Sequence, residues 1–141
     1  KSVLNGGGMI HRLNLSETIL FFANHRVIYA TNEEFLKALS QIQKKVPEKK
    51  IVVEAKSFED AKMLLDANVA VIQTDKLSLT DLEKTVAFKQ SASVQTKIVA
   101  AGGIDKDNCK DYVKTGIDAI VTSSVYGAKI SDLGAKIAIS G

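Results

Sequence analysis

The sequence of 141 residues predicts an α/β fold: a partial, open βα barrel with parallel strands. Short β-branched runs alternate with longer helical patterns along the chain, which indicates repeated βα units. The strand-like runs are mainly apolar, as in parallel sheets whose two faces are buried. A complete barrel takes about 250 residues, so about five units of this length correspond to half a barrel or to a small open sheet.

The first βα unit starts with a strand over residues 18–23 (TILFFA). Thr31 and Glu34 have the spacing of a capping box, which predicts a helix that begins after Thr31. Pro47 cannot continue a helix, so it separates this helix from a second strand over residues 50–55 (KIVVEA).

The later units repeat the pattern. Ser57 is a favourable N-cap, and Ser78 or Thr80 is another, so each predicts the start of a helix. A further helix is expected over about residues 105–114, and Gly116 suits the left-handed conformation just past its end. The remaining strands are expected at residues 70–74, 97–101, 119–122 and 136–140.

Composition excludes several classes of protein. With 45% hydrophobic and 25% charged residues, the chain is neither disordered nor fibrous, and no apolar run reaches the roughly 20 residues of a membrane span. A net charge of +3 is too small to indicate nucleic acid or an anionic membrane as a partner. The single cysteine, Cys109, can form no internal disulfide. A cytoplasmic protein is therefore expected.

Polar and glycine residues gather where the predicted strands end. In strand order, they are Asn24 and His25, Glu54, Asp75, Gly102 and Gly103, and Ser123 and Ser124. Ligands of parallel α/β folds bind at this edge, because the loops after the strands converge there. The sequence therefore predicts a ligand site at the carboxyl edge of the sheet.

Glu54 and Asp75 stand on consecutive predicted strands, so their side chains are expected to lie close together. Two neighbouring carboxylates suit Mg²⁺ or the vicinal hydroxyls of a sugar. Alternatively, each carboxylate caps the following helix or pairs with a lysine. Ser57 and Ser78 already occupy the N-cap positions, which makes capping by Glu54 and Asp75 less necessary.

Gly102 and Gly103 follow a predicted buried strand and precede a helix. Without side chains they let the backbone approach an anion near a helix N-terminus, which is a pattern of phosphate sites. A tight turn that needs glycine for steric reasons alone is the other interpretation. The chain contains neither a P-loop nor a dinucleotide-binding fingerprint.

The two arginines, Arg12 and Arg26, both lie near histidines in the first part of the chain. Arginine is suited to bidentate recognition of carboxylate or phosphate. A run of three glycines before His11 allows a bend that could present His11 and Arg12 inward. A surface turn with incidental basic residues is the alternative.

Several blocks in order resemble the type II phosphoribosyltransferases typified by quinolinate phosphoribosyltransferase. They are residues 6–12 (GGGMIHR), 15–17 (LSE), 24–25 (NH), 53–54 (VE), 74–75 (TD), 101–104 (AGGI) and 115–118 (TGID). The runs 15–26 (LSETILFFANHR), 100–103 (AAGG) and 121–124 (VTSS) are similar to the ModD-type branch of pyrophosphorylases, which is associated with molybdenum-transport genes.

The resemblance implies a transferase that uses phosphoribosyl pyrophosphate, Mg²⁺ and a small aromatic or heterocyclic carboxylate. It also implies a homodimer whose subunits carry an N-terminal domain and an open barrel. Residues 1–141 would be the C-terminal part of that barrel domain, with the N-terminal domain absent. Such a fragment is expected to be inactive by itself.

The resemblance also assigns roles to individual residues. It implies that His11 and Arg12 contact the carboxylate of the acceptor. The carboxylates of Glu54 and Asp75 would be the catalytic pair that holds ribose hydroxyls and Mg²⁺. The 5′-phosphate would lie in a cradle formed by Gly102 and Gly103 with Ser123 and Ser124, and Ala101 would also belong to the substrate-binding residues.

Two positions depart from the family pattern. Phe22 stands where the family usually has a lysine, and Ala101 stands where it usually has a serine. An apolar ring cannot balance the second carboxylate of a diacid, so quinolinate itself is a less suitable acceptor. The alternatives are quinolinate phosphoribosyltransferase proper, a phosphate or anion sensor without turnover, and an unrelated phosphosugar barrel enzyme.

Overall fold

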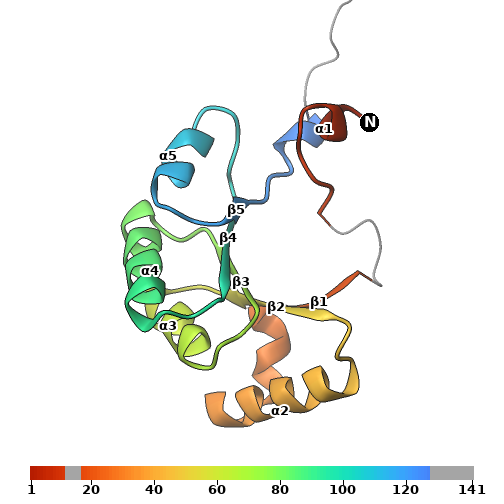
Figure 1. Ribbon diagram of the computed structural model, residues 1–141, viewed down its shortest axis with the longest axis vertical. Helices are drawn as coiled ribbons and strands as arrows, with labels where there is room; N and C mark the ends of the chain where they lie inside the picture. The colour runs from red at the N-terminus through yellow and green to blue at the C-terminus, as the bar shows by residue number, and fades with distance from the viewer. Residues whose placement is uncertain (12–16, 128–141) are drawn as a thin grey trace, which may run out of the picture.

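The computed structural model describes residues 1–11 and 17–127. Within them, five parallel strands form one sheet (Figure 1): β1 (Thr18–Phe21), β2 (Lys50–Ala55), β3 (Val71–Asp75), β4 (Lys97–Ala101) and β5 (Ala119–Ile120). Their order in the sheet is their order in the sequence. Doubly wound sheets reverse direction at a switch point, whereas barrels continue in one direction. The sheet is therefore an open part of a βα barrel, as predicted.

One main helix follows each of the first four strands in the chain. These helices are α2 (Asn32–Lys45), α3 (Phe58–Asp66), α4 (Leu79–Ala92) and α5 (Cys109–Lys114). Figure 1 shows α3, α4 and α5 on the same side of the sheet. Three short elements complete the described chain: α1 (Ser2–Asn5) and the 3-10 helices η1 (Ala23–Ile28) and η2 (Ser124–Gly127). None of the helices in the described ranges is long and apolar enough to cross a membrane.

The predicted N-caps are present. Thr31 Oγ1 accepts a hydrogen bond from the Glu34 N–H at 3.2 Å. Ser57 Oγ and Ser78 Oγ each accept one from the N–H three residues later, at 3.1 Å. These bonds satisfy donors that the first turn of a helix leaves unpaired, so the three helices start where the sequence predicts.

The core lies between the sheet and its helices. Val53, Ala55 and Ile72 are fully buried in it, together with Leu64 and Leu65 of α3. A second cluster lies beside α4 and α5 and comprises Leu77, Leu82, Ala100 and Ile104. Because side chains alternate along a strand, these strand residues all share one face, which we call the outer face.

The opposite face of the sheet, which we call the inner face, carries both apolar and polar side chains. Leu20, Val71 and Val99 point to it and are only half-buried. Glu54, Gln73 and Asp75 lie on the same face. Val52, Glu54, Gln73 and Ala101 on this face are buried, so the expectation of strands buried on both faces is confirmed for most of β2, β3 and β4.

Some boundaries differ from the predictions. β1 ends at Phe21 because η1 begins at Ala23, and β5 is only two residues long. The predicted helix over residues 105–114 begins at Cys109, because Asp105 and Asn108 form a turn in which Asn108 Oδ1 accepts the Asp105 N–H at 2.9 Å. The strand expected at residues 136–140 lies outside the described residues.

Candidate functional site

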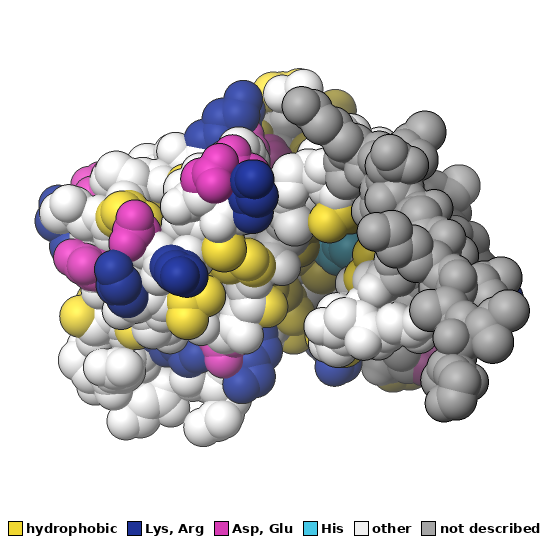
Figure 2. Space-filling view, turned by 90° about the horizontal axis from the view of Figure 1, so that it is seen from above, with side chains coloured by type: hydrophobic (Ala, Val, Ile, Leu, Met, Phe, Trp, Pro, Cys, Tyr) yellow, Lys and Arg dark blue, Asp and Glu magenta, His cyan; other side chains and the backbone are white. Residues whose placement is uncertain are grey.

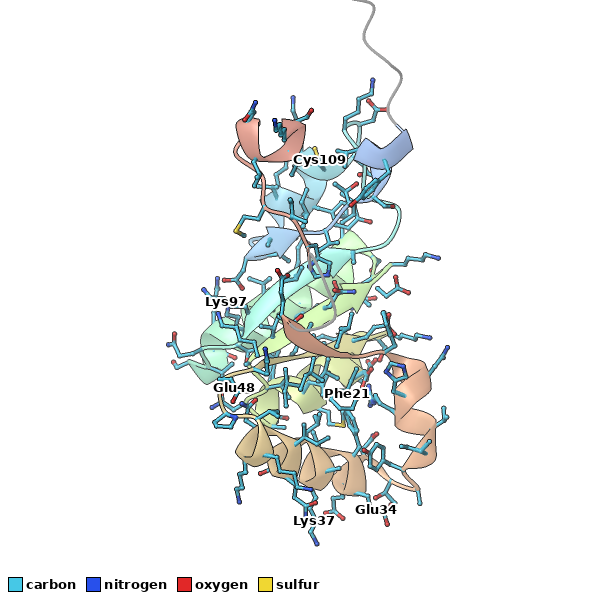
Figure 3. The ribbon with its side chains drawn as sticks, turned by 90° about the vertical axis from the view of Figure 1, so that its right-hand side faces the viewer. Phe21, Glu34, Lys37, Glu48, Lys97 and Cys109 are labelled. Atoms are coloured by element: carbon cyan, nitrogen blue, oxygen red, sulfur yellow. The ribbon has the colours of Figure 1, made fainter. Side chains whose placement is uncertain are left out.

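The carboxyl ends of the parallel strands share one edge of the sheet. In Figure 3, Glu48, which precedes β2, and Lys97, which begins β4, lie together at the opposite edge. The loops after β3, β4 and β5 therefore meet at the carboxyl edge, where the sequence predicts a ligand site.

The structure brings Asp75 and Gly102 into contact. Asp75 pairs with Ala101 in the register of β3 and β4, so Gly102 follows directly beside it. A Cβ atom added to Gly102 would lie 2.7 Å from Asp75 Oδ1 and 2.5 Å from Lys76 Cγ. Gly102 also has a φ of +91°, which side chains rarely adopt. Only glycine thus fits between the carboxylate and the turn without displacing them.

Glu54 lies on the neighbouring strand and on the same face as Asp75. It is paired with Gln73, two residues before Asp75 on β3, and is only 7% exposed. Its Oε2 accepts a hydrogen bond from the Ala23 N–H at 2.8 Å, and among the described residues it forms no ion pair with a lysine. This bond fixes the direction of the carboxylate.

The alternative roles proposed for the two carboxylates are not observed in the described part of the chain. Ser57 and Ser78 cap α3 and α4, so neither Glu54 nor Asp75 is needed there. Glu54 instead meets the first N–H of η1.

A pocket of about 310 Å³ lies between the loops after β4 and β5. Residues 101–105 and 121–124 line it, including the four positions predicted for the 5′-phosphate and Ala101. Thr122 Oγ1 donates to the Ile104 carbonyl and accepts from the Ser124 N–H at 3.1 Å, which ties the two loops together. The predicted positions Ala101, Gly102, Gly103, Ser123 and Ser124 are therefore brought together.

The predicted contribution of a helix N-terminus to this pocket is wrong. α5 begins at Cys109 and has only six residues, so a turn separates it from Gly103. The Asn108 Nδ2 donates to the Gly103 carbonyl at 2.9 Å and holds this turn. Any anion here would be bound by loop N–H groups and hydroxyls rather than by a helix end.

The basic residues of the first part of the chain separate into two groups. His11 is exposed and lies after α1, and Arg12 lies outside the described residues, so their predicted role stays a prediction. Arg26 has a structural role: its Nη1 contacts both carboxylate oxygens of Asp60 at 2.8 Å, and its guanidinium lies 4.9 Å from the centre of the Phe35 ring. Arg26 is thus engaged in joining η1 to α2 and α3.

Sequence reasoning missed two residues near the site. Lys76 follows Asp75 in a left-handed conformation with a φ of +56°, and its N–H donates to the Ala101 carbonyl at 2.9 Å. Gln73 is a buried amide in the middle of β3. The sequence did carry a signal for Gln73, because it is a polar residue within an otherwise apolar strand (AVIQT).

The two carboxylates fit the way in which Mg²⁺ is usually bound. No group of three or more His, Cys, Asp or Glu side chains that could hold a metal occurs in residues 1–11 and 17–127. Mg²⁺ typically uses one or two carboxylates and takes its other ligands from water and substrate phosphates. Glu54 and Asp75 provide two oxygen donor groups on one face, so the donor set suits Mg²⁺ with a phosphorylated ligand.

The visible described part of one face of the molecule shows no clustered patch of cations (Figure 2). Figure 2 views the molecule from above and shows Lys or Arg side chains interspersed with Asp or Glu over the visible described part. A nucleic-acid site would require clustered cations.

Comparisons with known proteins agree with the fold. The family described as "Quinolinate phosphoribosyl transferase, C-terminal domain" matches residues 1–136. A protein named "Putative pyrophosphorylase ModD" from Escherichia coli O157:H7 is 36% identical over 94% of this chain and 47% of its own length. "Nicotinate-nucleotide pyrophosphorylase [carboxylating]" of Mycobacterium leprae is 26% identical over 92% of this chain and 45% of its own length.

A solved structure shows the same arrangement. NadC from Streptococcus pyogenes has a TM-score of 0.76 and 28% sequence identity, over 88% of this chain and 42% of that chain. The chain thus spans about half the length of the relatives that it matches. With a family match that extends over nearly all of its residues, the chain belongs to the quinolinate phosphoribosyl transferase family and corresponds to the family's C-terminal domain.

Proposed function

We propose that the full-length protein is a Mg²⁺-dependent pyrophosphorylase that transfers a phosphoribosyl group from phosphoribosyl pyrophosphate to a small aromatic or heterocyclic carboxylate. The observation that supports this most directly is the contact between the Asp75 carboxylate and Gly102. It joins a carboxylate pair on β2 and β3 to the pocket of about 310 Å³ after β4 and β5. A sugar phosphate has hydroxyls that the carboxylate pair can bind and a phosphate that the pocket can hold.

In this proposal the 5′-phosphate occupies the pocket lined by residues 101–105 and 121–124. Glu54 and Asp75 accept hydrogen bonds from the ribose hydroxyls and hold Mg²⁺. His11 and Arg12 contact the carboxylate of the acceptor. Bound Mg²⁺ would neutralise the negative charge that develops on pyrophosphate as it leaves.

The reaction requires positioning more than covalent catalysis. The acceptor forms a bond to C1 of the ribose while the C1–O bond to pyrophosphate breaks, through an oxocarbenium-like transition state. The protein holds both reactants in line and stabilises the charges that develop. A carboxylate beside the sugar, such as Glu54, stabilises the positive charge on the ring.

The test is calorimetric titration of phosphoribosyl pyrophosphate into the full-length protein with and without Mg²⁺. Glu54→Ala and Asp75→Ala are each expected to abolish the Mg²⁺-dependent binding. Glu83→Ala is the matched control, because Glu83 is an exposed carboxylate on α4 away from the strands. Unchanged affinity in both site variants would contradict the proposal.

A second candidate is a phosphate or anion sensor derived from the same family. It is favoured by Phe22, an apolar ring that is 38% exposed just after β1, and by the methyl group of Ala101. A turnover assay with quinolinate, nicotinate and other heterocyclic carboxylates separates the two. Release of pyrophosphate supports the enzyme, and binding without release supports the sensor.

Among the family's members, a ModD-like role is our preferred proposal over quinolinate phosphoribosyltransferase proper. The 36% identity to ModD exceeds the 26% identity to the nicotinate-nucleotide pyrophosphorylase. The link to molybdenum transport, the cytoplasmic location and the homodimer also stay predictions. The turnover assay also tests the choice between the two enzymes, because activity on quinolinate would favour quinolinate phosphoribosyltransferase proper over a ModD-like role.

A further inference from the structure

Gln73 is a buried amide whose acceptor atom is unsatisfied. The residue is 7% exposed, and its Oε1 has no hydrogen-bond partner among the residues that the structure describes. Leaving a buried amide oxygen unpaired destabilises the folded protein, whereas an apolar side chain of similar size has no polar atom to leave unpaired. Val71, two residues earlier on the same face, shows that apolar side chains are accommodated there.

The position of Gln73 connects it with the candidate site. Strand register places Gln73 beside Glu54 on one side and beside Val99 on the other. Asp75 follows two residues later on the same strand, so all three polar side chains project from the inner face. Figure 3 views the molecule from the side of this face, away from α3 and α4. Three groups with acceptor oxygens thus lie on two adjacent strands.

Such a group of acceptors fits a ligand with several hydroxyl donors. A carboxylate accepts hydrogen bonds only, while an amide accepts through its oxygen and donates through its nitrogen. A diol can therefore donate to the Glu54 carboxylate and to Gln73 Oε1 from neighbouring carbon atoms. Adjacent strands lie about 4.8 Å apart, which brings the two side chains within reach of one sugar ring.

We propose that Gln73 binds a hydroxyl group of the pentose. This contact provides the hydrogen-bond partner that the buried Gln73 Oε1 lacks among the described residues. The inference rests on the proposed function, because it places a pentose phosphate in the same site. It adds a residue that distinguishes a sugar with free hydroxyls from a simple phosphate. The hydroxyl donates to Gln73 Oε1 while Glu54 and Asp75 hold the remaining polar groups.

The experiment measures binding to the full-length protein by calorimetry, in constant Mg²⁺, of ribose 5-phosphate, 2-deoxyribose 5-phosphate and inorganic phosphate. In Q73M, we expect affinity for ribose 5-phosphate to fall about tenfold, as for the loss of one hydrogen bond in a buried site. Affinity for inorganic phosphate should not change. If only ribose 5-phosphate weakens, the 2-hydroxyl is bound, and if both sugars weaken, another hydroxyl is bound. Both results support the proposal.

Melting temperatures separate recognition from folding. Q73M removes an unsatisfied amide, so its melting temperature should be equal to or higher than that of the wild type. Q73L provides a second apolar variant if Q73M folds poorly. T96V is the matched control, because Thr96 Oγ1 is also buried and unpartnered in the described region but precedes β4 at the opposite edge. It should leave every affinity unchanged.

Two results would overturn the inference. One is unchanged affinity of Q73M for ribose 5-phosphate, and the other is an equal loss for ribose 5-phosphate and inorganic phosphate. If Q73M binds normally while E54A abolishes binding of phosphoribosyl pyrophosphate, only this inference fails. If the wild type binds neither sugar phosphate, the proposed function fails as well.

Discussion

The two faces of the same strands differ toward their carboxyl ends. On the outer face, Val53 and Ile72 are completely buried against α2 and α3. On the inner face, their immediate neighbours Glu54 and Gln73 are polar. Successive side chains of a strand point to opposite faces, so a shift of one position along the strand changes a side chain from one that packs in the core to one that faces the candidate site. Stability and binding should therefore respond to different, interleaved positions.

The largest expected effect on stability is on the outer face. Ile72→Ala should lower the free energy of unfolding by about 3 kcal/mol, because it leaves a cavity in the core. Urea denaturation measures this change, and affinity for phosphoribosyl pyrophosphate should stay within about twofold. Val113→Ala is the control, since Val113 is 62% exposed on α5. A larger loss in affinity than in stability would contradict the separation of the faces.

Two adjacent glycines at the carboxyl edge, Gly102 and Gly103, differ in the space around them. Gly102→Ala should lower the free energy of unfolding by about 2 kcal/mol and weaken phosphate binding, because its Cβ would collide with Asp75 and Lys76. Gly103 has a φ of +72° but open space around it. Gly103→Ala should therefore cost only about 1 kcal/mol of backbone strain and leave Asp75 in place. Equal affinities in both variants would show that Asp75 does not need Gly102.

The smallest expected effect concerns charge at the edge opposite the site. Desolvation raises the pKa of Asp118, but hydrogen bonds from Lys89, the Ile98 N–H and Lys97 outweigh it and lower the pKa to about 2. Because the folded pKa is below the ordinary value of 3.8, the stabilisation is present above pH 3.8 and is lost as the pH falls through about 2. Asp118 thus joins β4, α4 and the start of β5.

Asp118→Asn should lower stability at neutral pH by about 1 kcal/mol, after allowance for solvent around Lys97. It should also flatten the pH dependence of unfolding between about pH 4 and 2. Thermal unfolding across this pH range measures both changes. Asp111→Asn, which removes an exposed pair with Lys114, is the control and should have no measurable effect at moderate salt. Weaker sugar-phosphate binding in Asp118→Asn would show that the two edges are coupled.

Much of the fold could be predicted because local signals agree with it. The strands β2 and β4 have the predicted boundaries, and Thr31, Ser57 and Ser78 cap their helices as expected. Each depends on a short stretch of sequence. The end of β1 and the start of α5 were predicted less well, because the turns at Ala23 and Asp105–Asn108 depend on contacts that the strand and helix patterns do not contain.

The candidate site could be predicted in outline but not in its detail. That Asp75 and Gly102 meet follows from parallel strands that share an edge. The role of Arg26 could not be read from the sequence, because its partners Asp60 and Phe35 lie on other elements. Gln73 was missed because a single polar residue in a strand carries no spacing pattern, and its unsatisfied oxygen is visible only in three dimensions.

The bond between the Glu54 carboxylate and the Ala23 N–H has an evolutionary consequence. Its donor is the main chain, so the side chain at position 23 contributes nothing to it. A substitution at position 23 keeps this bond if the new residue has a backbone N–H and its side chain fits the half-buried position. Proline has no N–H to donate, so it would remove the bond. Sequences descended from this one should therefore exclude proline at position 23.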